Sequence, residues 1–114
     1  MEVSLREESG LNVIGVEGRI DHANSGGFAE ALEPYLADCN EDTPPLVFDL
    51  SKVDYISSAG LRILMMTARR IKAQNGKFGV ASIQPVVQEV FTISKFHLVL
   101  PCFNDLEAAR QSLV

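Results

Sequence analysis

A chain of 114 residues is long enough for one hydrophobic core and too short for two, which predicts a single domain over residues 1–114. Hydrophobic residues make up 46% and charged residues 22%, a composition typical of a soluble globular protein. The net charge of −5 argues against a general nucleic-acid binder, and no stretch approaches the roughly 18 apolar residues of a membrane span. We therefore expect neither nucleic-acid binding nor direct insertion into a membrane.

Three further features of the sequence bear on where the protein is located and on whether it holds a disulfide or a metal. The opening MEVSLREESG carries acids where a signal peptide needs bases, so we expect a cytoplasmic protein. Cys39 and Cys102 lie far apart without CxxC spacing, which favours two reduced packing residues. His22 and His97 lack a local ligand partner, so we expect no metal and no cofactor.

Two alternating segments open the chain. Residues 2–8 and 11–20 alternate apolar and polar side chains, as half-buried strands do. The Ser9-Gly10 pair between them is a turn signal, so we predict a β-hairpin.

Residues 21–40 change to helical spacing. Apolar side chains recur there at three- and four-residue steps, namely Phe28, Leu32, Tyr35, Leu36 and Cys39. Pro34 disagrees with this pattern, because proline removes a backbone donor and crowds the preceding turn. We predict a helix with a kink or a break near Pro34.

A buried strand and a second helix follow. Residues 46–50, LVFDL, are apolar on both faces, which predicts a central strand covered on both sides. Residues 51–57 are expected to connect this strand to a helix over 59–75. The inward stripe of that helix consists of Leu61, Leu64, Met65, Ala68 and Ile71. The Asn75-Gly76 pair predicts its end.

In the last third of the chain, the apolar pattern predicts a strand over 77–83, a helix over 84–96 with Pro85 in its first turn, and a strand over 97–103. A short helix capped by Asn104 completes the chain. The order of elements is therefore ββαβαβαβα. Strands that alternate with helices imply an α/β fold, with helices packed against a mixed, mostly parallel sheet.

No motif in the sequence is complete enough to predict catalysis. The Ser25–Gly27 stretch lacks the spacing of a phosphate-binding loop, and the Ser57–Gly60 stretch lacks the first glycine of a GxSxG elbow. We therefore predict that the protein is not an enzyme. Ser57 and Ser58 suit the start of a helix, where a hydroxyl accepts from unpaired amides. However, Leu61 follows Ser58 by three residues, so no capping box explains the pair.

Four short motifs, in order and at matching separations, resemble the STAS family. They are a Gly-x-x-Asp turn at 18–21, an Asp-Leu-Ser strand end at 49–51, a Ser-x-Gly-Leu helix start at 58–61 and Asn75-Gly76. The resemblance covers nearly the whole chain and is greatest to the small bacterial anti-sigma factor antagonists. It implies the STAS fold.

The resemblance also implies a function by partner switching. In the family, the antagonist binds an anti-sigma factor that is also a serine kinase, and phosphorylation of a serine at the start of helix two ends the complex. A PP2C-type phosphatase removes the phosphate, so that the complex can form again. Carried over to this chain, the phosphoacceptor falls on Ser58, with Ser57 as second choice. Ser57 and Ala59 stand where many members have an Asp and a Ser or Thr.

The partner-binding residues that we predict surround this serine: Asp21, His22, Asn24, Ser57, Ser58, Arg62 and Met66. Two roles stay open for Asp21, which either accepts backbone donors in its turn or faces the partner. Arg62 either meets a phosphate or a partner acid, or is an ordinary solvated base. His22 reads as a surface residue, and Met66 as part of an apolar contact patch.

Two rival functions remain at this point. The first is an accessory subunit of a membrane lipid transporter, or of another signalling complex, in which phosphorylation plays no role. The second is a nucleotide-binding or hydrolytic enzyme. Such a protein needs a pocket lined by acids or bases with shifted pKa values, and the sequence offers no candidates for them. A protein that exchanges partners is simplest as a free monomer, which is the oligomeric state that we expect.

Overall fold

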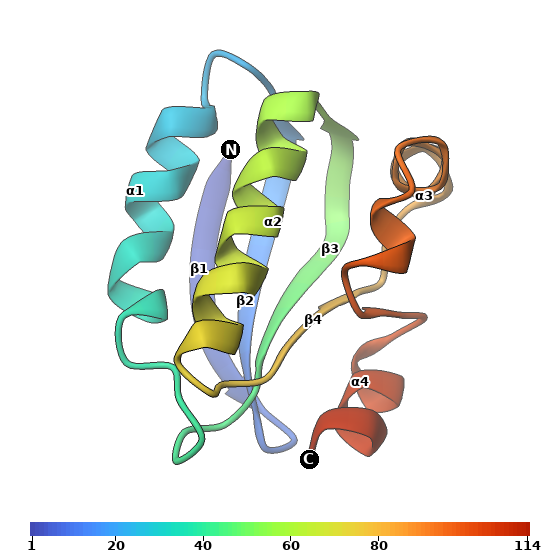
Figure 1. Ribbon diagram of the computed structural model, residues 1–114. Helices are drawn as coiled ribbons and strands as arrows, with labels where there is room; N and C mark the ends of the chain where they lie inside the picture. The colour runs from blue at the N-terminus through green and yellow to red at the C-terminus, as the bar shows by residue number, and fades with distance from the viewer.

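The computed structural model describes residues 1–114 (Figure 1). It contains one five-stranded sheet in the order β1-β2-β3-β4-β5. The strands are β1 (Glu2–Glu8), β2 (Leu11–Ile20), β3 (Leu46–Ile56), β4 (Phe78–Ala81) and β5 (Cys102–Phe103). The helices are α1 (Ser25–Leu36), α2 (Ser58–Ala73), α3 (Pro85–Ile93) and α4 (Leu106–Leu113), with a 3₁₀ turn η1 (Phe96–Leu98). The predicted α/β class and the predicted order of elements are confirmed.

The sheet is mixed as predicted, because only the β1–β2 hairpin is antiparallel. Ser9 and Gly10 form the two-residue turn of the hairpin, with φ angles of 54° and 79°. Positive φ at both turn residues is the geometry that matches the right-handed twist of paired strands. The Ser-Gly pair therefore fixes the register of the hairpin.

The helices lie on both faces of the sheet and bury two cores. Helices α1 and α2 lie side by side on one face (Figure 1), where Phe28, Leu64 and Phe48 belong to the larger buried cluster. Helix α4 covers the opposite face through Ala109, which packs in a smaller cluster with Val47. Since neighbouring residues of a strand point to opposite faces, β3 is buried on both, as its apolar run predicts.

The C-terminal end of α2 confirms the Asn-Gly signal. Asn75 takes the left-handed conformation with φ of 64°. The amide of Gly76 donates to the Ile71 carbonyl at 2.8 Å, and that of Asn75 to the Lys72 carbonyl at 3.0 Å, which is a Schellman motif. A Cβ at Gly76 would lie 2.8 Å from Ile71 Cγ2 and 2.9 Å from Cys39 Sγ. Only glycine fits there.

Strand β3 is longer than predicted. Residues 51–57 were expected only to connect two elements, but β3 runs on to Ile56. Its second half pairs with β2 after a register shift, so that Lys52 lies opposite Glu17. Gly18 permits a second irregularity with φ of 96°. The exposed polar residues of this half hid the strand from a periodicity argument.

Helix α1 passes through Pro34 without the expected break. The helix begins at Ser25 and ends at Leu36, within the predicted segment of 21–40. Pro34 lies exposed in the last turn, and the helix ends two residues beyond it at Leu36. Cys39 is buried as predicted, although it lies beyond the helix.

The predicted strand over 97–103 is mostly wrong. Residues 96–98 form η1, and only Cys102 and Phe103 pair with β4. Lys95 precedes η1 with φ of 60°, which turns the chain out of α3. The N-cap of α4 is Asp105 rather than Asn104, because Asp105 Oδ1 accepts from the Ala108 amide at 2.8 Å. The apolar run was misleading because some of its residues, such as Leu98 and Val99, lie exposed in turns rather than in a strand.

The ion pair between Arg6 and Asp49, on the face of the sheet away from α1 and α2, predicts that the stability of the protein depends on pH. Asp49 accepts from Arg6 Nη2 at 3.0 Å and from the Ser51 amide at 3.0 Å. Partial burial by itself would raise the pKa of Asp49, but these hydrogen bonds outweigh it and hold that pKa below its usual value. The stabilisation is therefore complete above about pH 3.9 and is lost as the pH falls through the lower native pKa.

We expect Asp49→Asn to lower the free energy of unfolding by about 1 kcal/mol at pH 7, because the pair is partly exposed. The difference from the wild type should shrink below about pH 4. Urea unfolding followed by circular dichroism from pH 7 to pH 2 measures it. Asp42→Asn, in an exposed loop, is the control. A difference that stays constant down to pH 2 would contradict the assignment.

Candidate partner-binding site

The two segments that the sequence singled out meet at one edge of the sheet. The parallel strands β2 and β3 end there side by side, and the loop before α1 and the start of α2 follow them (Figure 1). The Ser57 amide donates to the Ile20 carbonyl at 2.8 Å, which ties the two segments together. Residues 37 positions apart in the chain thus form one surface.

The loop before α1 is held by side-chain hydrogen bonds. The Asn24 amide donates to Asp21 Oδ1 at 3.0 Å, and the Asp21 amide donates to Asn24 Oδ1 at 2.9 Å. Asn24 Nδ2 also donates to the Arg19 carbonyl at 2.8 Å. Asp21 therefore accepts from a backbone amide, which is one of its two predicted roles. The side-chain amide of Asn24 is hydrogen-bonded within the protein, to the Arg19 carbonyl. His22 is exposed at the tip.

The adjacent serines at the start of α2 have different surroundings. Ser57 is the N-cap, since its Oγ accepts from the Gly60 amide at 3.2 Å and the residue is half-buried. Ser58 is the first residue of the helix and is exposed. Ser57 is thus engaged in holding the helix start, whereas Ser58 faces solvent.

Gly60 sets how closely α2 approaches the sheet. A Cβ at Gly60 would lie 2.6 Å from Ile20 Cγ2 and 2.9 Å from Ile56 Cγ1, both in buried side chains. The first turn of α2 is therefore seated directly on the ends of β2 and β3. This contact fixes the position of Ser58 relative to the loop before α1.

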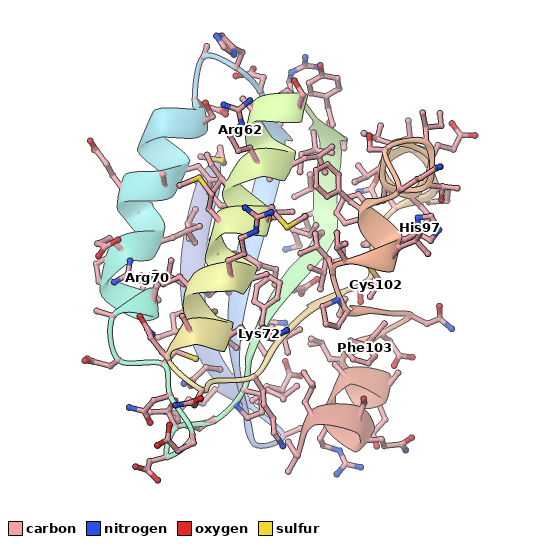
Figure 2. All side chains as sticks on the ribbon, viewed as in Figure 1. Arg62, Arg70, Lys72, His97, Cys102 and Phe103 are labelled. Atoms are coloured by element: carbon pink, nitrogen blue, oxygen red, sulfur yellow. The ribbon has the colours of Figure 1, made fainter.

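Arg62 and Met66 continue the exposed face of α2. They follow Ser58 at steps of four residues, so the three side chains lie on one stripe of the helix. Arg62 is exposed and lies toward the N-terminal end of α2, at the loop's end of the molecule (Figure 2). Met66 is 61% exposed, so it adds a large apolar side chain to this face of α2. Met65, predicted to face inward, is half-buried, and Thr67 is buried instead.

The same edge holds two residues that the sequence alone did not single out. The Arg19 guanidinium lies 4.4 Å from the centre of the Tyr55 ring, and Arg19 Nε lies 3.8 Å from Asp21 Oδ2. Arg19 and Tyr55 are partners in the β2–β3 register. Only that register, with its irregularities, brings them together, so no local signal in the sequence predicts the pair.

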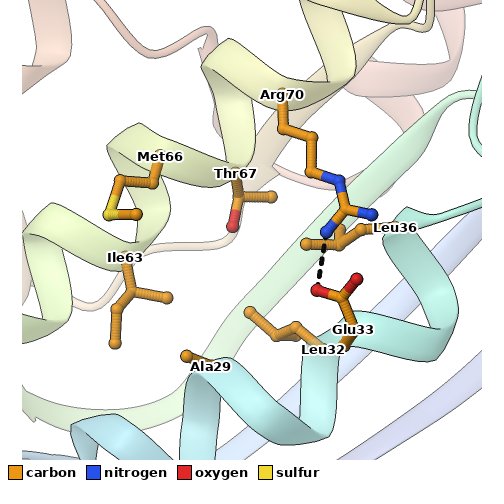
Figure 3. Close-up of a pocket in the computed structure, with 8 residues that line it drawn as sticks. All are labelled: Ala29, Leu32, Glu33, Leu36, Ile63, Met66, Thr67 and Arg70. Atoms are coloured by element: carbon orange, nitrogen blue, oxygen red, sulfur yellow. Dashed lines mark hydrogen bonds and ion pairs between the residues drawn. The ribbon is translucent and has the colours of Figure 1, made fainter.

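A groove between α1 and α2 adjoins the stripe and was also missed. It has a volume of about 240 Å³ and is lined by Ala29, Leu32, Glu33, Leu36, Ile63, Met66, Thr67 and Arg70 (Figure 3). Arg70 Nη1 donates to Glu33 Oε2 at 2.6 Å across it. Met66 belongs both to this groove and to the exposed stripe.

The remaining reactive side chains do not gather into a site. No three His, Cys, Asp or Glu side chains lie together as metal ligands would. Cys39 and Cys102 are free thiols, as predicted, and burial raises the pKa of each. None of the helices combines the length and the apolar character that crossing a bilayer requires.

The fold and this edge define a small α/β domain with one continuous surface formed by a loop and a helix start. The STAS domain profile matches residues 2–109, and the chain belongs to the STAS family, as its motifs predicted. A Bordetella bronchiseptica protein named "Putative anti-sigma factor antagonist BtrV" is 34% identical over 110 residues, covering 96% of this chain and 91% of that protein.

Two further relatives carry similar names. The Mycobacterium tuberculosis anti-sigma-F factor antagonist RsfB is 35% identical over 107 residues, covering 94% of this chain and 84% of RsfB. The crystal structure of an anti-sigma factor antagonist from Mycobacterium paratuberculosis matches with a TM-score of 0.85 at 27% identity, over 98% of this chain and 92% of that chain. The matches extend over nearly the full length, so they concern the whole fold.

Proposed function

We propose that this protein is a cytoplasmic anti-sigma factor antagonist that acts by partner switching, with Ser58 as its phosphoacceptor. The observation that carries the proposal is the contrast between the two serines. Ser57 Oγ is engaged with the Gly60 amide, whereas Ser58 is exposed at the start of α2. The names of the full-length relatives support the same class of function.

The partner in this proposal is an anti-sigma factor that is also a serine kinase. The unphosphorylated protein binds it through the loop before α1 and the exposed stripe of α2. The kinase then transfers the γ-phosphoryl group of ATP to Ser58 Oγ, with loss of the hydroxyl proton and release of ADP. A PP2C-type phosphatase hydrolyses the phosphoserine with water and returns inorganic phosphate and the free serine.

The position of Ser58 suits such a switch. A phosphate adds about −1.5 to −2 charge and three acceptor oxygens. The N-terminus of α2 tolerates an anion, because its backbone amides and its dipole favour negative charge there. The fold is therefore expected to survive phosphorylation. A partner surface docked on the same residue meets new bulk and charge, so the complex is expected to dissociate.

Phosphate mapping tests the assignment. The kinase-type anti-sigma factors encoded by the source genome are purified and incubated one at a time with this protein and ATP. We expect one phosphate, on Ser58, by mass spectrometry, and none on Ser58→Ala. Ser57→Ala is the matched control and should still accept one phosphate on Ser58. Full phosphorylation of Ser58→Ala would overturn the assignment and favour Ser57.

A further inference from the structure

The groove between α1 and α2 has the form of a receptor for one apolar side chain. Its floor is made of Leu32 and Leu36, which are 0% and 5% exposed. Its rim is made of Ile63, Met66 and Ala29, which are half-buried or exposed (Figure 3). The volume of about 240 Å³ is below the roughly 300–1,000 Å³ of most small-molecule pockets. One large side chain is therefore the better fit.

One end of this groove is closed by polar contacts. Arg70 bridges to Glu33 at 2.6 Å, and Arg70 Nε donates to Gln74 Oε1 at 3.1 Å. Gln74 Nε2 in turn donates to the carbonyls of Leu36 and Cys39 at 2.9 and 2.7 Å. These contacts clasp the C-terminal ends of α1 and α2 together. These hydrogen bonds therefore hold the two helices at the separation that leaves the groove between them.

The charges on the α2 side of the groove favour an acidic occupant, and the one acid that lines the groove, Glu33 of α1, is neutralised by Arg70. Helix α2 carries four bases and no acid, although the whole chain has a net charge of −5. Most other bases are paired with a nearby acid, namely Arg6, Arg19, Lys52 and Arg110. Among the bases of α2 only Arg70 has an ion-pair partner, which leaves Arg62, Arg69 and Lys72 without one.

The helix dipole does not explain this distribution fully. Lys72 lies in the last turn of α2, where a positive charge is favourable. Arg62 lies near the opposite end, where a positive charge gains nothing from the dipole. Arg62, Met66 and Arg69 share one stripe of the helix surface, since they are separated by four and three residues. An exposed methionine is therefore flanked by two bases with free positive charge.

We infer that the groove is the second anchor of the partner interface and takes an apolar side chain from an acidic segment of the anti-sigma factor. This inference rests on the proposed function. The apolar side chain enters between Met66 and Leu32, and flanking carboxylates of the partner meet Arg62 and Arg69. From Ser58 to Met66 the helix rises about 12 Å, so one partner surface of ordinary size spans both anchors.

Paired substitutions on α2 and α3 test the inference. The probe is the purified anti-sigma factor that binds the unphosphorylated wild type, and affinity and rates are measured by surface plasmon resonance. Met66→Gln keeps the side-chain length and should weaken binding about 10- to 50-fold, mostly through faster dissociation. Arg69→Glu should weaken it about 5- to 10-fold, mostly through slower association, and this effect should fade at high salt.

The controls lie on α3 and just beyond it. Ile93→Gln removes an apolar side chain that is 82% exposed, and Lys95→Glu reverses an exposed base without an ion pair. Both should bind within about twofold of the wild type, as expected outside an interface. All four positions are exposed, so the variants should keep the far-ultraviolet circular dichroism and the melting temperature of the wild type.

The outcomes separate the two proposals. If no anti-sigma factor of the source organism binds the wild type, the proposed function fails and this inference fails with it. If the wild type binds and Ser58→Asp does not, the proposed function stands. In that case, a Met66→Gln variant indistinguishable from Ile93→Gln, or an Arg69→Glu variant that binds more tightly, overturns the second anchor alone.

Discussion

Replacement of Ser58 by aspartate is expected to leave the protein folded and to weaken its complex with the anti-sigma factor at least about 100-fold. A 100-fold loss corresponds to about 2.7 kcal/mol of binding free energy. The fold should tolerate the carboxylate, because Ser58 is exposed at the N-terminus of α2, where negative charge is favourable. The complex should not, because an unpaired charge is costly to desolvate at the centre of an interface.

The measurement combines isothermal titration calorimetry with thermal unfolding of the free protein. Ser112→Asp is the matched control, because it adds the same charge at an exposed serine of α4. It should bind like the wild type. If Ser58→Asp binds with unchanged affinity while remaining folded, charge at this residue does not control the complex and the partner-switching mechanism is wrong.

Substitution of Gly60 by alanine should be the most destabilising small change in the site. The added Cβ would approach Ile20 Cγ2 to 2.6 Å and Ile56 Cγ1 to 2.9 Å, and both side chains are fixed in the core. Overpacking of this kind costs about 1–3 kcal/mol of unfolding free energy. Helix α2 would have to move off the ends of β2 and β3. Urea unfolding at pH 7 measures the loss.

Gly27→Ala provides a control at the same helical position. Gly27 is the third residue of α1, as Gly60 is of α2, but no atom lies within 4 Å of a Cβ placed there. Alanine should therefore raise the free energy of unfolding by about 0.5–1 kcal/mol, through the lower entropy of the unfolded chain. If the two variants are equally stable, the first turn of α2 is not held tightly against Ile20 and Ile56.

The prediction of the fold from sequence succeeded where local chemistry decides the structure. The Ser9-Gly10 turn, the serine-capped start of α2 and the Asn75-Gly76 helix end each depend on atoms within a few residues. It failed where pairing with a distant strand decides. The second half of β3 is a strand only because β2 lies beside it, and Cys102 and Phe103 are a strand only because of β4.

The site divides in the same way. Ser58, Arg62 and Met66 share an exposed stripe by helical spacing alone, and their separation in the chain was enough to group them. Their proximity to the loop before α1 was implied by family resemblance, and the hydrogen bond from the Ser57 amide to the Ile20 carbonyl provides it. Asp21 and Asn24 then define the loop through reciprocal hydrogen bonds, of which the sequence suggested only the acceptor role of Asp21, as one of two alternatives.

The amino-acid sequence by itself determined the class of fold and the start and end of α2, because caps, turns and amphipathic spacing are short-range effects. Only the tertiary structure decided that Arg19 stacks on Tyr55 and that α1 and α2 leave a groove beside Met66. Both features require the strand register and the distance between two helices. Those quantities are set by packing of the whole core, so they cannot be inferred from any one segment.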